Sequence, residues 1–484
     1  MVQVRGARAR TAGAVAAGAV SPEIRFGTDG WRAVIAREFT FDNVARVARA
    51  IAAYVLGAPA PRGVVVGYDN RFLSEEFARL ATEVLNAAGV PVLLTGGPAP
   101  TPAVAWAVRE HGLAGAVMLT ASHNPPIYHG IKFISPEGGP SGPEITTRIE
   151  AHLREGRRIS ASGGGAAAVQ TFDPAPGYRA QLRRLVNLEA VGRAHLRLVV
   201  DPMHGSGAGY LEDLLREAGC EVTSIRTRRD PYFGGGLPEP VAARLEPLFR
   251  EVSERDAALG LALDGDADRF GIVDRGGRFV SPNQFLPVLL NHLLRVRRLQ
   301  GPVGRTVATT HLLDRVAEAS GSRAVETPVG FKYQARLLVD EGAVLGSEES
   351  GGVSIAGHIP EKDGILAGLL AAEIVATSGL TFDQLTRSLH ARFGPHFSAR
   401  RDIPFPAEAR SRTLESLPEL RPDRLPAAVT GRNTVDGVKL TLADGSWFLA
   451  RPSGTENLLR VYAEAADPNR VARLQDAVVS ALGL

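Results

Sequence analysis

Residues 63–95 read GVVVGYDNRFLSEEFARLATEVLNAAGVPVLLT. The first six and the last six residues are mostly apolar, as in buried strands, and residues 74–88 between them have the apolar spacing of a helix. A second helix is expected at 102–111 and a third strand at 115–119. Strands that alternate with helices of this length predict an α/β fold with a mostly parallel sheet covered by helices on both faces.

The alternation returns after a linker-like stretch rich in glycine, alanine and serine, residues 156–170. A second unit is expected with strands at 196–200 and 221–226 and a helix from about residue 207. The last region departs from this pattern, with short strands at 438–442, 446–450 and 459–463 and a closing helix. We therefore expect three successive α/β domains with mixed, mostly parallel sheets around a central cleft, and a smaller C-terminal α+β domain. The expected boundaries are a disordered extension at 1–20 and domains at 21–157, 171–278, 279–393 and 394–484.

Length and composition describe a globular enzyme of several domains. The chain has 484 residues, too many for one core of ordinary size. Hydrophobic residues make up 44%, aromatic residues 6%, and there are 53 glycines, a balance that favours a turn-rich globular protein. Because no run of about eighteen apolar residues occurs, we expect no contact with a membrane.

The charge balance does not indicate a nucleic-acid-binding surface. The formal charge is +3, from 55 basic and 52 acidic residues, and the first twenty residues hold Arg5, Arg8 and Arg10 with no acid. The sequence pI of 9.1 therefore reflects this leader. The leader lacks the large apolar residues of a signal peptide. The single cysteine, Cys220, reads as a core residue and fits a cytoplasmic protein.

Only four basic residues are lysines: Lys132, Lys332, Lys362 and Lys439. The chain uses arginine wherever a generic positive charge is needed. A remaining lysine therefore indicates a position that needs a compact ammonium group able to lose its proton. Three of the four lie in or near the motifs below, which favours a functional role for Lys132 over chance placement.

The sequence TASHNP at 120–125 ends the third strand of the first unit, and Lys132 follows seven residues after its proline. A hydroxyl beside a histidine, at the end of an apolar strand, is where a nucleophile would be placed. A simple turn that closes the strand is the alternative for this pattern alone.

The sequence DGDADR at 264–269 follows the apolar strand 259–263. Carboxylates at alternate positions can converge on a hard cation, and oxygen ligands select Mg²⁺, Ca²⁺ or Mn²⁺ over zinc. The EF-hand interpretation fails because Arg269 and Arg275 stand where that loop needs glycine and glutamate. A solvated acidic turn is the alternative, but the apolar strand favours a buried metal site.

Two further loops carry clustered polar groups. The sequence GSEESGG at 346–352 suits the neighbouring hydroxyls of a sugar. The sequence RPSGTEN at 451–457, with Arg460 nearby, provides the groups that grip a phosphate. A turn and a hairpin loop are the respective alternatives. Because ligands of open α/β sheets bind at the carboxyl ends of strands, the loops could face one cleft.

Nucleotide-binding motifs are weak or absent. The sequence GSGAGY at 205–210 resembles a dinucleotide fingerprint, but Tyr210 occupies its last glycine position. No phosphate-binding loop of the form GxxxxGK[S/T] occurs.

Together with FGTDGWR at 26–32, these loops resemble those of the α-D-phosphohexomutase superfamily, in the family's order and over nearly the whole chain from about Phe26. The resemblance implies that Ser122 carries a catalytic phosphate. The implied sites are Arg32, His123, Lys132 and Arg269 at the reaction centre; Ser122, Asp264, Asp266 and Asp268 on Mg²⁺; Glu348, Ser350, His311 and Lys332 on the sugar; and Arg451, Ser453, Gly454, Thr455 and Arg460 on the distant phosphate.

The resemblance implies that a phosphoryl group moves between C1 and C6 of a hexose phosphate through a phosphoserine and a hexose 1,6-bisphosphate. Glu348-Glu349-Ser350 resembles the glucose-phosphate branch, so glucose 1-phosphate and glucose 6-phosphate are the expected substrates. The alternatives are a preference for mannose phosphates or a dual specificity and, less favoured, a preference for glucosamine phosphates. We expect one Mg²⁺ per chain and glucose 1,6-bisphosphate as activator. The expected oligomeric state is a monomer or a homodimer. We also expect the C-terminal domain to move so that the cleft closes against water.

Two rivals belong to other classes. A metal-assisted phosphatase would release phosphate steadily without isomerisation, whereas a mutase would be activated by the bisphosphate. A non-catalytic sugar-phosphate-binding protein would bind ligand and never carry phosphate on Ser122.

Overall fold

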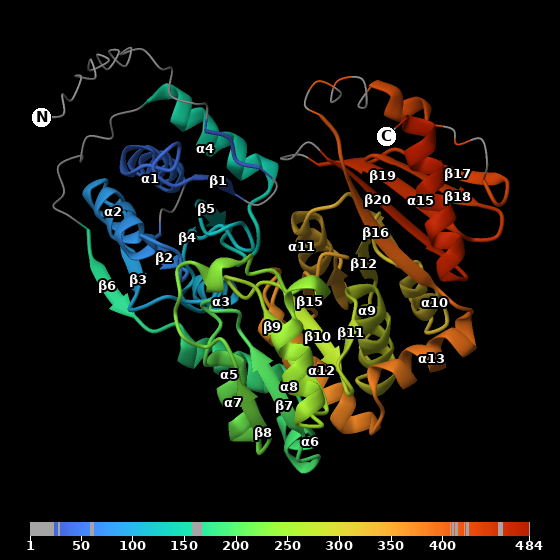
Figure 1. Ribbon diagram of the computed structural model, residues 1–484. Helices are drawn as coiled ribbons and strands as arrows, with labels where there is room; N and C mark the ends of the chain where they lie inside the picture. The colour runs from blue at the N-terminus through green and yellow to red at the C-terminus, as the bar shows by residue number, and fades with distance from the viewer. Residues whose placement is uncertain are drawn as a thin grey trace, which may run out of the picture.

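The structure is a computed structural model that describes residues 24–483, except for 28–29, 59–61, 157–166, 407, 409–410, 412–414, 421, 423–424 and 454–457. The described residues form four sheets that follow one another along the chain (Figure 1). The expected extension over 1–20 and most of the expected linker lie outside the described residues.

The first domain has a six-stranded sheet of order β1-β5-β4-β2-β3-β6. Strands β4, β2, β3 and β6 are parallel to one another, and β5 and β1 are antiparallel additions. The strands are β1 (Trp31–Val34), β2 (Val64–Tyr68), β3 (Val92–Thr95), β4 (Gly115–Leu119), β5 (Tyr128–Ile134) and β6 (Val169–Phe172), and the helices are α1 (Phe41–Leu56), α2 (Ser74–Ala87), α3 (Thr101–His111) and α4 (Pro143–Glu155). The alternation expected over 63–119 is present as β2, α2, β3, α3 and β4. Strand β6, however, adds residues 169–172 to the edge of this sheet, and the first two of them lie in the stretch expected to be a linker.

The second domain has a sheet of order β11-β10-β9-β7-β8, in which β8, β7 and β9 are parallel. Its strands are β7 (Arg197–Asp201), β8 (Glu221–Ser224), β9 (Leu259–Leu263), β10 (Phe270–Asp274) and β11 (Arg278–Val280). Its helices are α5 (Ala175–Leu185), α6 (Leu188–Arg193), α7 (Tyr210–Ala218) and α8 (Glu246–Glu254), with short 3₁₀ turns η1 (Phe233–Gly235) and η2 (Ala242–Arg244).

The third domain has a sheet of order β13-β12-β14-β15, in which β15 is the antiparallel strand. Its strands are β12 (Val303–Thr306), β13 (Ala324–Thr327), β14 (Leu345–Ser347) and β15 (Val353–Ile355). Its helices are α9 (Pro282–Asn291), α10 (Leu312–Glu318), α11 (Phe331–Asp340), α12 (Gly364–Ser378) and α13 (Phe382–Phe393), with a π-helical turn η3 (His292–Val296) after α9.

One hydrophobic core spans the second and third domains. Helix α12 is buried from Gly364 to Ile374 and packs against α6, α7, β9 and β10 of the second domain as well as β15 of its own. A helix that is apolar on every side belongs in such a core. Among the described residues no single helix is long and apolar enough to span a membrane. The pair α12 and α13, bent by 76°, has the required length and composition only when the two helices are taken together.

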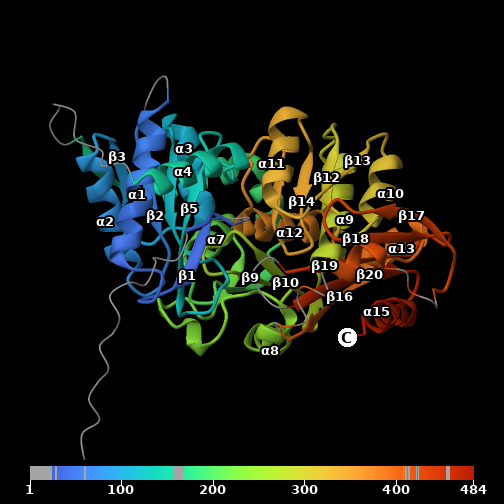
Figure 2. The same ribbon diagram turned by 90° about the horizontal axis from the view of Figure 1, so that it is seen from above.

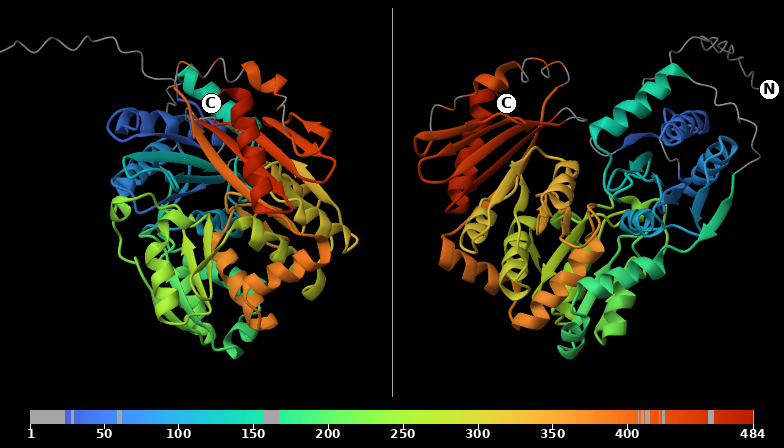
Figure 3. Two further views of the ribbon diagram at one scale, coloured as in Figure 1. Left: turned by 45° about the vertical axis from the view of Figure 1, so that its right-hand side comes forward. Right: turned by 180° about the vertical axis from the view of Figure 1, so that it is seen from behind.

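The fourth domain has an antiparallel sheet of order β16-β20-β19-β18-β17 covered by α15 (Pro468–Leu482). Its strands are β16 (Phe397–Pro404), β17 (Val429–Asn433), β18 (Val438–Leu442), β19 (Trp447–Pro452) and β20 (Leu458–Ala465), with a 3₁₀ turn η5 (Leu417–Glu419). Figure 2 shows the first domain (blue to teal) on one side of the molecule, and the third (yellow to orange) and fourth (red) domains next to each other on the other side. Figure 3 shows the fourth sheet resting on the third domain from two further sides. The expected three α/β domains and smaller C-terminal domain are confirmed.

Candidate active site

Ser122 lies in the loop between β4 and β5, at the carboxyl end of the buried strand that the sequence predicts. Its backbone is left-handed, with φ of 50°, a conformation that costs about 1 kcal/mol or more for a non-glycine residue and is found at functional sites. Its side chain is 1% exposed. Ser122 Oγ donates a hydrogen bond to Asp264 Oδ2 at 2.7 Å and lies 3.3 Å from His123 Nδ1. The serine loop and the aspartate loop therefore meet.

A buried arginine shapes the serine loop. The Arg71 guanidinium donates to four carbonyl oxygens, at 2.6 to 3.0 Å, on Ser122, Asn124, Pro125 and Tyr128. Its Nε lies 3.2 Å from Asp69 Oδ2, and both side chains are fully buried. Because one rigid fork binds four carbonyls, the strained backbone at Ser122 is held in a single conformation.

Asp69 joins the same arrangement to the strand ends. It accepts hydrogen bonds from Thr120 Oγ1 at 2.6 Å and Ser74 Oγ at 2.7 Å. Thr120 Oγ1 in turn accepts from Ser122 N at 2.9 Å. Sequence reasoning missed Asp69 and Arg71, although polar residues directly after the buried strand β2 were a usable signal.

Asp264, Asp266 and Asp268 are fully buried between β9 and β10, and one ligand oxygen from each lies within 4.8 Å of the others. Asp264 Oδ1 accepts from Arg269 N at 3.0 Å, and Asp266 Oδ2 accepts from Thr101 Oγ1 at 2.6 Å. Burial, and then the charges of Asp266 and Asp268, raise the pKa of Asp264 well above its ordinary value. Three carboxylates this close need positive charge between them.

The donor set fits a divalent magnesium ion. Asp266 Oδ1 and Asp268 Oδ1 are buried without a hydrogen-bond partner. Carboxylate oxygens with a serine hydroxyl beside them are hard ligands of the kind that Mg²⁺ prefers. Ser122 Oγ, on Asp264, is placed to bring a phosphate oxygen to the same point.

Two buried lysines meet at the metal loop. Lys132 Nζ, on β5, donates to Asp266 Oδ2 at 2.9 Å and Asp268 Oδ2 at 2.8 Å. Lys362 Nζ lies 3.3 Å from Asp268 Oδ2 and 3.1 Å from Glu361 Oε1. Burial acts to raise the pKa of Asp266, but the charge and hydrogen bond of Lys132 and the hydrogen bond from Thr101 outweigh it and lower this pKa. Sequence reasoning gave Lys362 no role, although the scarcity of lysine pointed at it.

The other residues that the resemblance implies at a reaction centre contact the serine and aspartate loops. Arg32 Nη1 donates to Asn124 Oδ1 at 2.6 Å, and Arg269 Nε lies 3.9 Å from Asp268 Oδ1. Burial, followed by the charges of Arg269 and Arg32, lowers the pKa of His123 well below its ordinary value. His123 is therefore a neutral imidazole next to Ser122, in a region rich in positive charge.

The discounted loop at 205–210 packs against the metal loop. Ser206 N donates to Gly265 O at 3.0 Å. A Cβ at Gly205 would lie 2.7 Å from Asp264 O, and one at Gly207 would lie 2.7 Å from Ala267 Cβ. The glycines thus permit close contact between two loops of the second domain.

The glutamate loop lies between β14 and β15 of the third domain. Glu348 is 6% exposed, and its Oε1 accepts a hydrogen bond from Gly330 N at 2.9 Å. Lys332, two residues further on at the start of α11, lies over the ring of Tyr333 at 5.3 Å. The described contacts therefore join Glu348 to the segment that carries Lys332, while Ser350 lies half-buried in the same loop.

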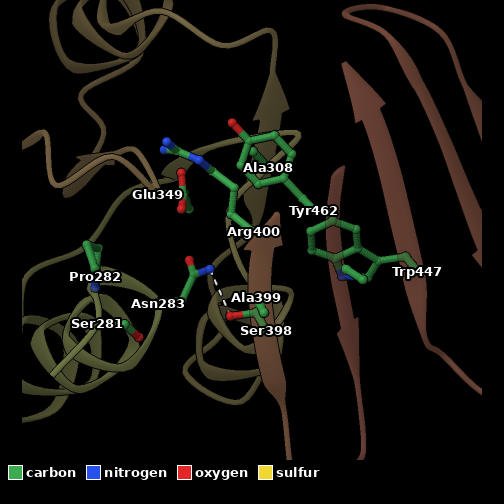
Figure 4. Close-up of a pocket in the computed structure, with 11 residues that line it drawn as sticks. Ser281, Pro282, Asn283, Ala308, Glu349, Ser398, Ala399, Arg400, Trp447 and Tyr462 are labelled. Atoms are coloured by element: carbon green, nitrogen blue, oxygen red, sulfur yellow. Dashed lines mark hydrogen bonds between the residues drawn. The ribbon is translucent and has the colours of Figure 1, made fainter. Parts of the chain in front are cut away.

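The side chain of Glu349 lines a cavity that does not include the aspartate loop. A cavity of about 150 Å³ lies between the third and fourth domains, and Figure 4 shows Glu349, Arg400 and Tyr462 around it. Asn283 Nδ2 donates to Ser398 Oγ at 2.9 Å across this boundary. Burial raises the pKa of Glu349 although Arg400 and Arg460 oppose it.

His311 lies at the same domain boundary, at the start of α10. Its Nε2 is 2.8 Å from Lys439 Nζ, and its ring lies 5.2 Å from that of Trp447. Lys439 also donates to Glu326 Oε2 at 2.6 Å. Burial and the charge of Arg305 lower the pKa of Lys439 to about 8. The side chain of His311 contacts Lys439 and Trp447 of the fourth domain and Glu326 of the third. Within the described residues, no hydrogen bond or ion pair joins it to the glutamate loop.

The arginine loop is described in part. Arg451 Nε, on β19, donates to Asp436 Oδ1 at 2.8 Å, and Arg451 pairs in register with Arg460 on β20. Ser453 is 1% exposed, and its N donates to Leu458 O at 2.9 Å. The sequence-predicted Gly454 and Thr455 lie outside the described residues.

Three α/β domains, a smaller antiparallel domain and a buried serine on a triad of aspartates define the phosphohexomutase class, isomerase-type phosphotransferases. Four phosphoglucomutase/phosphomannomutase family models match in order: α/β/α domain I at 23–159, domain II at 176–277, domain III at 281–393 and the C-terminal domain at 408–481. The chain belongs to the phosphoglucomutase/phosphomannomutase family of the α-D-phosphohexomutase superfamily.

Individual relatives carry different substrate names. A phosphoglucomutase/phosphomannomutase of Thermococcus kodakarensis is 31% identical over 91% of this chain and 94% of its own length. A protein of Methanothermobacter thermautotrophicus described as a phosphoglucosamine mutase is 32% identical over 91% and 93%. A crystal structure from Thermus thermophilus, described as a phosphomannomutase, is 37% identical, covers 95% of this chain and 98% of its own, and has a TM-score of 0.82.

Proposed function

We propose that the chain is a phosphoglucomutase that interconverts glucose 1-phosphate and glucose 6-phosphate through a phosphoserine at Ser122 and a glucose 1,6-bisphosphate intermediate. The observation that carries this proposal is the hydrogen bond from Ser122 Oγ to Asp264 inside a buried triad. The Glu348-Glu349-Ser350 sequence supports glucose as the sugar.

In the proposed reaction a hydroxyl of the bound sugar phosphate attacks the phosphorus on Ser122. The new P–O bond forms to the sugar, the P–Oγ bond of Ser122 breaks, and the proton of the attacking hydroxyl passes to the neutral imidazole of His123, while Lys132 stays a cation paired with Asp266 and Asp268. The bisphosphate then turns over in the cleft, and the other phosphoryl group returns to Ser122 by the reverse step. The two transfers leave the enzyme as it began.

Positive charge lowers the barrier to this transfer. A Mg²⁺ held by Asp264, Asp266 and Asp268 would neutralise charge on the phosphoryl oxygens. Fixed cations come from two strands, with Arg32 on β1 and Lys132 on β5, and from two loops, with Arg269 after β9 and Lys362 before α12. The burial of the site strengthens their effect. Glu348 and Ser350 would bind sugar hydroxyls, while Arg451, Ser453 and Arg460 hold the phosphate that is not being transferred.

The expected substrate preference is testable with three sugars. We expect kcat/KM to be at least about tenfold higher for glucose 1-phosphate than for mannose 1-phosphate or glucosamine 1-phosphate, because a buried glutamate left without its hydroxyl partner costs about 1–3 kcal/mol. The measurement is steady-state kinetics on each, with glucose 1,6-bisphosphate present. Equal or higher efficiency with another sugar would reject glucose as the preferred substrate.

Metal removal is a second test. Treatment with a chelator is expected to lower turnover by at least about 100-fold, because the charge on the transferred phosphoryl loses its largest compensation. Added Mg²⁺ should restore it. Calorimetric titration should also show Mg²⁺ binding to the wild type and none to Asp266→Ala. Asp213 is a half-buried acid on α7, and Asp213→Ala should bind Mg²⁺ as the wild type does. Full turnover in metal-free protein would contradict the assignment.

A further inference from the structure

The turn between β17 and β18 docks the fourth domain on the third. In this docking turn, residues 433–439, Asn433 Nδ2 donates to Glu326 Oε1 and Lys439 Nζ donates to Glu326 Oε2, both at 2.6 Å. Between them, Asp436 Oδ2 accepts a hydrogen bond from Val329 N at 2.9 Å. Three side chains of one turn therefore contact residues 326–329, the end of β13 and the segment that follows it.

Asp436 has a second partner, which belongs to the arginine loop. Its Oδ1 accepts the hydrogen bond from Arg451 Nε at 2.8 Å. The next peptide N–H after that of Val329 belongs to Gly330, and it donates to Glu348 Oε1 at 2.9 Å. One carboxylate and two successive peptide groups thus link the arginine of the fourth domain to the glutamate of the third.

The backbone of the docking turn is suited to this contact. Gly437 has φ of 90°, and a Cβ there would lie 2.5 Å from Ala450 O and 3.0 Å from Arg451 Cα. Only glycine allows this close approach in a left-handed conformation. The side chains of Asp436 and Arg451 are 22% and 15% exposed, so water screens their charge-assisted hydrogen bond only in part.

We propose that Asp436 is a positioning residue that couples the grip of Arg451 on the substrate's phosphate to the grip of Glu348 on its sugar, an inference that rests on the proposed function. The hydrogen bond from Arg451 Nε to Asp436 fixes the plane of the guanidinium. The hydrogen bond from Val329 N to Asp436 fixes the peptide segment, and the N–H of the next residue, Gly330, orients Glu348. With this link, a ligand that contacts both Arg451 and Glu348 is bound more tightly than it would be if the two residues were positioned independently.

A double-mutant cycle tests this coupling. The affinity for glucose 1-phosphate is measured by calorimetry in the full-length wild type, Asp436→Ala, Glu348→Gln and the double variant. We expect Asp436→Ala to weaken binding about tenfold, the effect of losing a charge-assisted hydrogen bond. In the Asp436→Ala background, Glu348→Gln should cost at least about threefold less than in the wild type, because coupled residues are non-additive.

Two further variants separate positioning from loss of structure. Asp436→Asn keeps one acceptor oxygen, and we expect an affinity between those of the wild type and Asp436→Ala. Asp444→Ala removes a fourth-domain carboxylate that pairs with Arg470, and its effect should add to that of Glu348→Gln. If the double variant loses affinity for glucose 1-phosphate by the product of the two single-variant factors, the proposed coupling is wrong.

Turnover of the wild type is measured separately. Tight binding of glucose 1-phosphate without isomerisation would reject the proposed mutase function, and the cycle would still decide the coupling. Isomerisation together with multiplying effects would reject the coupling and leave the proposed function standing. Failure of the wild type to bind glucose 1-phosphate would overturn both.

Discussion

Replacing Ser122 with alanine is expected to lower kcat for hexose phosphate isomerisation by at least about 10,000-fold, because the group that stores the phosphoryl between the two transfers is gone. The affinity for glucose 1-phosphate should change by less than about threefold, since Glu348 and Arg451 are untouched. Steady-state turnover and calorimetric binding of the same preparation measure the two effects.

A second serine provides the control. Ser141 Oγ donates to Phe133 O of β5 in the same domain at 2.6 Å, so Ser141→Ala also removes a bonded hydroxyl. Its turnover should stay within about twofold of the wild type. Turnover of Ser122→Ala at a similar level would show that the phosphoryl group does not pass through Ser122.

The second large effect is expected from Arg71, which touches no reacting atom. Arg71→Met removes donors to four carbonyls and leaves Asp69 as a buried, unpaired charge. Breaking a buried pair in this way costs about 3–5 kcal/mol. We expect the free energy of unfolding of the first domain to fall by that amount. We also expect kcat to fall at least about 100-fold, because Ser122 leaves its constrained conformation. Denaturant titration and kinetics of the folded fraction give both values.

Two variants bracket this effect. Arg71→Lys keeps the charge but not the planar fork, so it should be more stable than Arg71→Met while kcat stays low. Arg79→Met breaks the exposed ion pairs with Glu75 and Glu76 on α2, and exposed pairs contribute about 1 kcal/mol or less. A kcat of Arg71→Met within about threefold of the wild type would contradict the role given to this arginine.

The sheet architecture could be predicted because strands and helices have different apolar periods. Strand β6 was not predicted, because none of its four side chains is buried and the stretch therefore lacks the pattern of a core strand. The differences at the ends of other elements have local causes. Strand β3 begins at Val92 instead of residue 90, because Pro91 has no N–H to donate. Helix α7 begins at Tyr210 instead of 207, because Gly209 has φ of 85°. Strand β14 begins at Leu345 and extends into the polar sequence 346–352 as far as Ser347, because it pairs with β12 through Ser347.

The site could be predicted where its chemistry is written in consecutive residues. The serine and aspartate loops are such motifs, and they meet in the structure. Arg71, Thr101 and Lys362 could not be found in this way, because each is a single residue from another segment that folding brings to the loops. The scarcity of lysine was informative, since Lys132, Lys362 and Lys439 are all at most 4% exposed and ion-paired.

The assignment of sugar-binding residues rests more on resemblance to the family than the assignment of the serine and aspartate loops does. Glu348 accepts a hydrogen bond from Gly330 N, two residues before Lys332. His311, by contrast, is packed against Lys439 and Trp447 at the boundary of the third and fourth domains, so its role on the sugar stays a prediction. No pattern within a motif identifies which face of a domain another domain will cover.

The most direct test of the account is the covalent state of the protein after a brief incubation with glucose 1,6-bisphosphate and Mg²⁺. Peptide mass spectrometry should find one phosphoryl group on the peptide that contains Ser122 and none on that peptide in Ser122→Ala. After the free bisphosphate is removed, added glucose 1-phosphate should be converted to glucose 6-phosphate while the Ser122 peptide keeps one phosphoryl group, because the second transfer restores it. A phosphoryl group on another residue, or release of inorganic phosphate in place of isomerisation, would contradict the account.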